Sequence, residues 1–165
     1  MVTEFVEADV LGHILFALTH DNCLVCKVAL ETGLRVGDIL KLKSSLLENN
    51  SFTIIEEKTN KKRTVTLSDG LVYELKSIAG KNYVFEHRTD STKHRTRQAV
   101  YKDIKRACKL FRIKENVSPH SLRKAYAVDL YRECNDLNVV MQALNHNSEL
   151  VTMLYAMADI LKKRG

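Results

Sequence analysis

The strongest local signal in this sequence is a helix start at Ser118-Pro119, and Pro119 is the only proline of the chain. Proline has no backbone N–H and a fixed backbone angle, so it suits the first position of a helix, and a serine before it can act as the cap. We expect a helix from Pro119 to about residue 133. Its first turn carries His120 and Arg123, three positions apart and therefore on one face. The exposed N–H groups of such a turn favour an anion.

Periodicity and turn residues divide the remaining chain into short elements. Further helices are expected over 8–19, 22–31, 36–43, 70–79, 91–112, 137–144 and 149–161. The β-branched runs 51–57 and 62–67, joined by a polar turn, predict a β-hairpin, and 83–85 predicts a short strand. The expected fold class is α+β, mostly helical, with one small antiparallel sheet, in a single domain spanning 1–165.

Positive charge is concentrated in two stretches. The chain has 26 Lys and Arg against 20 Asp and Glu, for a net charge of +6. Residues 58–63 contain four basic residues and no acid, and 87–109 is also predominantly basic. Such patches suit a polyanion, although a solvated face is the simpler explanation for any one of them. No apolar run is long enough for a transmembrane helix and the start lacks a basic signal region, so we expect a cytoplasmic protein without membrane contact.

The four cysteines indicate a reducing compartment. Cys23 and Cys26 have CxxC spacing, but no second Cys or His pair stands near them. They fall in a run that reads as a buried helix, so core packing is the preferred interpretation over zinc or redox chemistry.

Four separated residues could form one phosphate site with His120. Arg35 follows Gly33 in a Thr-Gly-Leu-Arg turn and could reach the anion bound by Arg123. Two guanidinium groups bind non-bridging phosphate oxygens in a geometry that lysine cannot copy, although each arginine alone is more often a surface ion pair. His146 and Tyr155 follow downstream. A tyrosine of pKa about 10 is a weak nucleophile at neutral pH, and nearby arginines stabilise both its phenolate and the transition state.

Five motifs, in this order, resemble the tyrosine recombinase (phage-type integrase) family over about residues 8–160. They are Thr32-Gly33-Leu34-Arg35, the hairpin segment that begins at Lys58, Pro119-His120-Ser121-Leu122-Arg123-Lys124, Leu144-Asn145-His146-Asn147-Ser148 and Thr152-Met153-Leu154-Tyr155. The resemblance implies an integrase-like catalytic domain that cuts and rejoins DNA for integration or excision. It also implies that no cofactor or metal is needed, because a protein–DNA ester conserves the energy of the broken bond.

The resemblance also implies a role for each matched residue. Tyr155 would form a 3′-phosphotyrosyl bond and release a 5′-hydroxyl, while Arg35 and Arg123 stabilise the charge on the phosphoryl oxygens. Lys58 would protonate the leaving oxygen; it is preferred over Lys61 and Lys62 because it follows the end of the first strand. The other implied roles are acid/base assistance by His120, phosphate binding by His146, support of Arg35 by Asp38, and DNA contacts by Lys61, Lys62, Arg63, Arg95, Arg97 and Lys124.

Departures from the family pattern remove none of the proposed catalytic groups. Asn145 stands where glycine usually precedes the second histidine, and it is the next-best residue for a left-handed backbone. Asp38 replaces a longer glutamate, Ala125 replaces a hydroxyl residue, and Ala156-Met157 stands where a histidine is common. The usual N-terminal helical DNA-binding domain is absent from the sequence pattern, so the chain reads either as a fragment or as a short family member.

The implied partner is double-stranded DNA. The family resemblance predicts a monomer in solution and a tetramer on DNA, with accessory DNA-bending proteins compatible with that assembly. Three alternatives stay open at this level: a recombinase-derived protein that binds DNA without cutting it, a helix-turn-helix regulator built on 119–133 and 137–144, and a type IB topoisomerase. The regulator leaves the Arg35 turn and the hairpin unexplained, and the short Leu-Asn-His box fits a topoisomerase less well.

Overall fold

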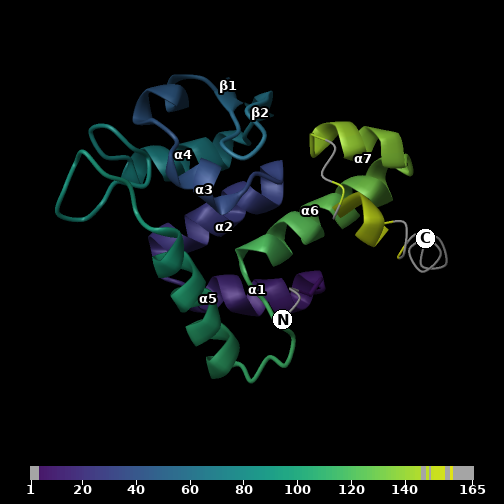
Figure 1. Ribbon diagram of the computed structural model, residues 1–165. Coiled ribbons are helices and arrows are strands. Elements are labelled where there is room, and N and C mark those ends of the chain that lie inside the picture. Colours follow the sequence, from purple (N-terminus) through teal and green to yellow (C-terminus); the bar gives the residue numbers. More distant parts are fainter. Residues whose placement is uncertain (1–3, 146–147, 149, 155–156, 158–165) are drawn as a thin grey trace.

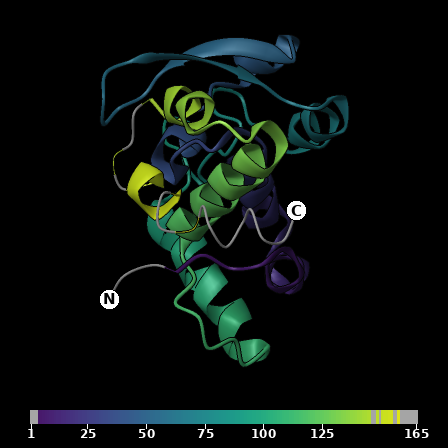
Figure 2. The ribbon, with the colours of Figure 1, turned by 90° about the vertical axis from the view of Figure 1, so that its right-hand side faces the viewer.

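The computed structural model describes residues 4–145, 148, 150–154 and 157, and in these residues a group of helices carries a β-hairpin at one end (Figure 1). The elements are α1 (Ala8–Ala17), α2 (His20–Thr32), α3 (Val36–Leu40), the 3-10 helix η1 (Ser44–Glu48), β1 (Ser51–Ile55), β2 (Lys62–Thr66), α4 (Asp69–Ile78), α5 (Arg97–Leu110), α6 (Pro119–Cys134) and α7 (Leu137–Ala143). The two views place the hairpin and the far end of α5 at opposite ends of the molecule (Figures 1 and 2). The α+β, mostly helical prediction is confirmed.

Helix α6 joins two apolar clusters. Its first half, through Leu122 and Ala125, packs into the main core formed with α1 to α5. Its second half, through Val128 and Tyr131, packs with α7 and with buried residues of the 150–154 segment. α2 lies against α6 and also contacts α3 and α4. The first turn of α6 is thereby fixed against the part of the molecule that carries the hairpin.

The helix start at Ser118 is confirmed. The Ser118 hydroxyl accepts a hydrogen bond from the backbone N–H of His120 at 3.3 Å, and Ser121 Oγ accepts from the Ser118 N–H at 3.1 Å. Pro119 occupies the first position, where a missing N–H costs nothing. These reciprocal bonds determine where the first turn of α6 begins and therefore where the His120 and Arg123 side chains leave the helix.

The predicted hairpin is also confirmed, with Ser51 opposite Thr66 and Phe52 opposite Val65. Phe52 and Val65 face inward, as the two-residue period of a strand requires. The same alternation continues past the end of β1, so that Glu56 lies on the buried face. The hairpin turn therefore starts from a buried carboxylate.

Two predicted elements are wrong in extent. Residues 83–85 form no strand; Tyr83 makes only an isolated antiparallel bridge with Lys43. The helix expected from residue 91 begins at Arg97, because Thr96 caps it by accepting from the Ala99 N–H at 3.2 Å. Residues 91–93 form a turn instead, and the Arg95 N–H donates to the Phe85 carbonyl at 2.8 Å.

Smaller differences affect the remaining elements. The helix expected over 36–43 ends at Leu40, and the 3-10 helix η1 was not predicted. Of the last expected helix, 149–161, residues 150–154 and 157 are described and are helical. Cys26 is buried in the core, as expected. Within the described ranges, no helix combines the length and the apolar character that a membrane crossing needs.

Candidate active site

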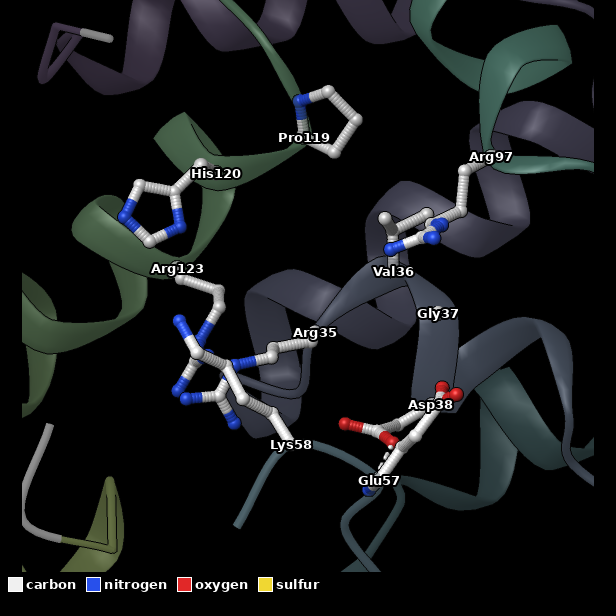
Figure 3. A pocket seen from close by; sticks show the side chains of 10 residues that line it. All are labelled: Arg35, Val36, Gly37, Asp38, Glu57, Lys58, Arg97, Pro119, His120 and Arg123. Atoms are coloured by element: carbon white, nitrogen blue, oxygen red, sulfur yellow. Dashed lines mark hydrogen bonds between the residues drawn. The ribbon is translucent and has the colours of Figure 1, made fainter. Parts of the chain in front are cut away.

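A polar pocket of about 510 Å³ lies between the first turn of α6, the start of α3 and the hairpin turn (Figure 3). It gathers four of the predicted catalytic side chains from distant parts of the chain, together with predicted supporting and DNA-contacting residues. Its lining residues are Arg35, Val36, Gly37, Asp38, Glu57, Lys58, Arg97, Pro119, His120 and Arg123. The fold thus brings together side chains that are widely separated in the sequence.

The Arg35 side chain reaches the pocket from a tight turn between α2 and α3. Gly33 ends α2 with a positive φ of 67°, the left-handed conformation expected from the sequence. A Cβ at this position would also collide with the ring of Tyr126 on α6. Because only glycine allows both the turn and this close approach, the turn holds Arg35 near the residues presented by α6.

Arg123 is a buried cation without a described partner. Its residue is 1% exposed, and in the described part of the chain none of its three guanidinium nitrogens has a hydrogen-bond acceptor. Burial, followed by repulsion from Arg35, lowers the pKa of Arg123 to about 10. Buried charges are normally paired, so this guanidinium is suited to an anion that enters the pocket.

Lys58 is the hairpin lysine that lines the pocket, and its side chain extends from the turn toward Arg35 and Arg123 (Figure 3). Lys61 and Lys62 are exposed and are not among the lining residues. His120 lines the pocket beside Arg123, from the same face of α6. The geometry therefore favours Lys58 over its two neighbours for a role at a bound phosphate.

The carboxylate beside Arg35 is Glu56 rather than the predicted Asp38. Glu56 Oε2 lies 3.2 Å from Arg35 Nη1, and the glutamate is fully buried. Asp38 instead accepts the backbone N–H of Glu57 through Oδ1 at 3.0 Å, which fastens the start of the hairpin turn to α3. The sequence analysis missed Glu56, although strand alternation from Phe52 onward could have identified it as an inward-facing acid.

Three predicted DNA contacts occupy other positions. Arg63 pairs with Glu56 Oε1 at 3.2 Å and also donates to the Thr32 carbonyl, with only 9% of its side chain exposed. Arg95 pairs with Asp21 at 3.0 Å, away from the pocket. Lys124 is buried. These positions do not support direct contacts to DNA, because burial and local acids already occupy the side chains.

Arg97 differs from these three residues. It is exposed at the first position of α5 and lines the pocket opposite His120 (Figure 3). Its guanidinium acts on Glu57 across the pocket and contributes to the lowered pKa of that carboxyl, after the larger effect of Lys41. Arg97 is thus the predicted DNA contact outside the hairpin that the structure leaves accessible.

Asn145 follows α7 and acts on the buried Glu56 carboxyl. Its φ of 51° confirms the left-handed conformation expected where a glycine usually stands. Burial would raise the pKa of Glu56, but the Asn145 amide and the Arg63 guanidinium outweigh it and lower that pKa. Leu154 is fully buried. The predicted His146 and Tyr155, and Ala156, lie outside the described residues.

Within the described residues, no cluster of His, Cys, Asp or Glu side chains has the arrangement of a metal site. The acids of the pocket are instead engaged by basic groups and backbone N–H groups. The arrangement of three arginines, a lysine and a histidine around an open pocket is that of an anion-binding site whose charge comes from side chains.

The chain belongs to the phage integrase family, whose profile, described as "Phage integrase family", matches residues 4–160. A tyrosine recombinase of Thermosipho africanus is 29% identical over 93% of this chain and 57% of its own length. The tyrosine recombinase XerD of Rhizobium meliloti is 31% identical over 81% of this chain and 45% of its own length. The chain thus spans about half the length of these curated relatives.

Solved structures of the same class share the fold. XerH site-specific recombinase, bound to its difH substrate in a pre-cleavage complex, matches 90% of this chain and 49% of its own with a TM-score of 0.68 and 26% identity. A lambda integrase dimer bound to a core site matches 93% and 48%, with a TM-score of 0.77 and 20% identity. The mostly helical domain with a two-stranded sheet is therefore the integrase catalytic fold.

Proposed function

We propose that this chain catalyses site-specific DNA recombination, for integration or excision, by strand cleavage and rejoining through a 3′-phosphotyrosyl intermediate. The observation that carries the proposal is the buried guanidinium of Arg123, which lies beside Arg35 and has no hydrogen-bond acceptor among the described residues. A scissile phosphodiester would supply the missing acceptor, and the two guanidinium groups would stabilise the additional charge that develops on its non-bridging oxygens during attack.

The chemistry needs one nucleophile and one acid. The Tyr155 phenolic oxygen gives up its proton to His120, attacks phosphorus and displaces the 5′-oxygen, leaving the 3′-phosphate esterified to the protein. Lys58 donates the proton that the leaving 5′-oxygen takes up, His120 assists as acid/base, and His146 binds a phosphate oxygen. Attack by a 5′-hydroxyl on the phosphotyrosine reverses the step and rejoins the strand. Lys58 and His120 are supported in these roles by their places in the pocket.

Double-stranded DNA is the proposed partner. The exposed basic residues around the pocket, Lys61, Lys62 and Arg97, would contact the backbone on either side of the scissile phosphate. Among the solved relatives are a XerH bound to DNA and a lambda integrase tetramer bound to a Holliday junction. By analogy we propose that this chain is a monomer in solution and assembles as a tetramer on DNA.

A nicked suicide substrate tests the catalytic proposal. Loss of the short 5′-hydroxyl fragment prevents rejoining, so a protein–DNA adduct accumulates and survives denaturation. At low salt and saturating DNA, the wild-type chain and Tyr73→Phe should trap DNA, because Tyr73 is exposed on α4, away from the pocket. Tyr155→Phe should trap none. Absence of any adduct with the wild-type chain bound to DNA would favour the alternative, a recombinase-derived protein that binds without cutting.

A further inference from the structure

We propose that Glu56 and Arg63 form a positioning clamp that fixes Arg35 and the Lys58 turn relative to each other. Glu56 Oε2 accepts from Arg35 Nη1 at 3.2 Å, and its Oε1 accepts from Arg63 Nη1 at 3.2 Å. Arg63 also donates to the carbonyl of Thr32. The inference rests on the proposed function of the same pocket, and it assigns a role to two residues that would not touch DNA.

The clamp connects two separate chain segments in a closed circuit. Thr32 and Arg35 lie on either side of the Gly33 turn. Glu56 directly follows β1, and Arg63 is the second residue of β2, so both lie next to the hairpin turn. The same Glu56 oxygen also accepts from the Thr59 hydroxyl at 3.1 Å, within the hairpin turn itself. Movement of the hairpin turn would therefore break contacts to the turn that carries Arg35.

Burial disfavours alternative arrangements of these contacts. Glu56 is fully buried and 9% of the Arg63 side chain is exposed. Removing one member would leave its partners charged and unpaired in a region of low dielectric, which penalises alternative arrangements. A buried ion pair is weak evidence for stability, but it is well suited to fixing geometry. An exposed pair such as Lys41 and Glu57 imposes no such constraint.

Charge balance gives the clamp a second effect. Arg35 and Arg63 repel the Arg123 guanidinium, whereas Glu56 and Asp38, both buried acids, attract it. Glu56 thus lets Arg35 approach Arg123 closely while Arg123 stays available for the phosphate.

The test separates reaction rate from DNA affinity. Glu56→Gln keeps the shape of the side chain but loses the charge that binds two arginines. We expect its adduct to form roughly 100-fold more slowly at saturating DNA, because small misplacements of catalytic groups cost about this much. DNA affinity should stay within about threefold of the wild type, or increase, because the variant has one acid fewer.

Asp103→Asn is the matched control. Asp103 is also a buried acid that pairs with an arginine, Arg106 at 2.7 Å, but it lies between α1, α2 and α5 and outside the pocket. This variant should lower the melting temperature while the folded protein reacts at the wild-type rate. A general loss of stability would slow neither folded variant, so slow reaction of folded Glu56→Gln alone indicates positioning.

Arg63→Lys provides a milder second variant in case Glu56→Gln does not fold. It keeps the net charge but cannot contact both Glu56 and the Thr32 carbonyl with a planar fork, and about tenfold slower cleavage is expected. Wild-type rates in both variants, with both folded, would overturn the clamp while leaving the recombinase proposal intact.

A thermal-stability cycle decides the matter without DNA. If Glu56 holds Arg63, the losses in melting temperature of Glu56→Gln and Arg63→Met should be strongly non-additive in the double variant. Non-additive losses in melting temperature, together with no adduct from the wild-type chain, would contradict the recombinase proposal but support the contact between Glu56 and Arg63. Fully additive losses would sink the clamp whatever the adduct assay shows.

Discussion

Burying a guanidinium group without an acceptor destabilises a protein, and Arg123 is such a group as far as residues 4–145, 148, 150–154 and 157 show. We expect Arg123→Met to stabilise the DNA-free chain by about 1–3 kcal/mol, because an apolar side chain of similar length removes an uncompensated buried charge. The same variant should form no adduct with the suicide substrate. Urea unfolding checks the first effect, and Arg88→Met, at an exposed position, should change stability by less than about 0.5 kcal/mol.

The pH dependence of this difference follows from the pKa of about 10 for Arg123. Between that value and the ordinary guanidinium pKa, the unfolded chain retains a proton that the folded chain has released, so rising pH favours the folded state. The stability advantage of Arg123→Met should therefore be complete at neutral pH and shrink as the pH rises through 10. An advantage that is constant from pH 7 to 11 would contradict an unpaired charge at this position.

Gly33 illustrates how a single residue determines the distance between two arginines. Gly33→Ala should destabilise the chain by about 2–4 kcal/mol, since a Cβ is strained at positive φ and meets the Tyr126 ring. Gly12→Ala is the matched control: it lies within α1 with open space around it, and should stabilise by about 0.5–1 kcal/mol. Equal effects of the two substitutions in urea unfolding would show that the turn is not constrained.

At the scale of elements, the signals that the sequence revealed are local ones. Ser118 and Pro119 specify the start of α6 through bonds within one turn, and Asp136 likewise caps α7 by accepting from the Asn138 N–H at 2.8 Å. The hairpin and the left-handed Gly33 also depend on short-range chemistry. Such features could be predicted because the residues that determine them are neighbours in the chain.

The elements that the sequence misassigned depend on distant partners. The residues before Arg97 were expected to be helical, but Arg95 is held by Asp21 and by the Phe85 carbonyl, and residues 91–93 form a turn. Tyr83 has strand propensity, but its backbone pairs with Lys43 in an isolated bridge and not in a strand. The partner of Arg35 was misassigned for the same reason, because Glu56 approaches it across the fold and not along one helix.

The hairpin contains basic residues with two different roles. Lys61→Gln and Lys62→Gln should each reduce the slope of log affinity against log salt by about 1, because each removes one contact to the DNA backbone. Arg63→Gln should leave the slope unchanged and lower stability by about 3 kcal/mol, because it breaks a buried pair with Glu56. Fluorescence anisotropy over a salt series measures the slopes. An equal slope change for all three variants would indicate that Arg63 also contacts the DNA backbone.

At the scale of the whole molecule, the residues that determine the fold differ from those expected to bind DNA. The fold is determined by two apolar clusters that share α6, and it matches relatives of about twice the length. The accessible cations predicted to contact DNA are few: Arg97 lines the pocket, and Lys61 and Lys62 are exposed on the hairpin. If the proposed catalytic residues act as inferred, the chain has a limited surface with which to hold its substrate.

We accordingly expect this chain by itself to bind duplex DNA weakly. With about five phosphate contacts, log affinity should fall with log salt at a slope of about −4 to −5, and binding should be lost near physiological salt. Anisotropy titrations from 50 to 300 mM salt would measure this, and light scattering should show a monomer without DNA. Tight binding that persists at high salt would mean that apolar contacts or further cations hold the DNA. The cations named above would then be insufficient to explain how this protein binds its substrate.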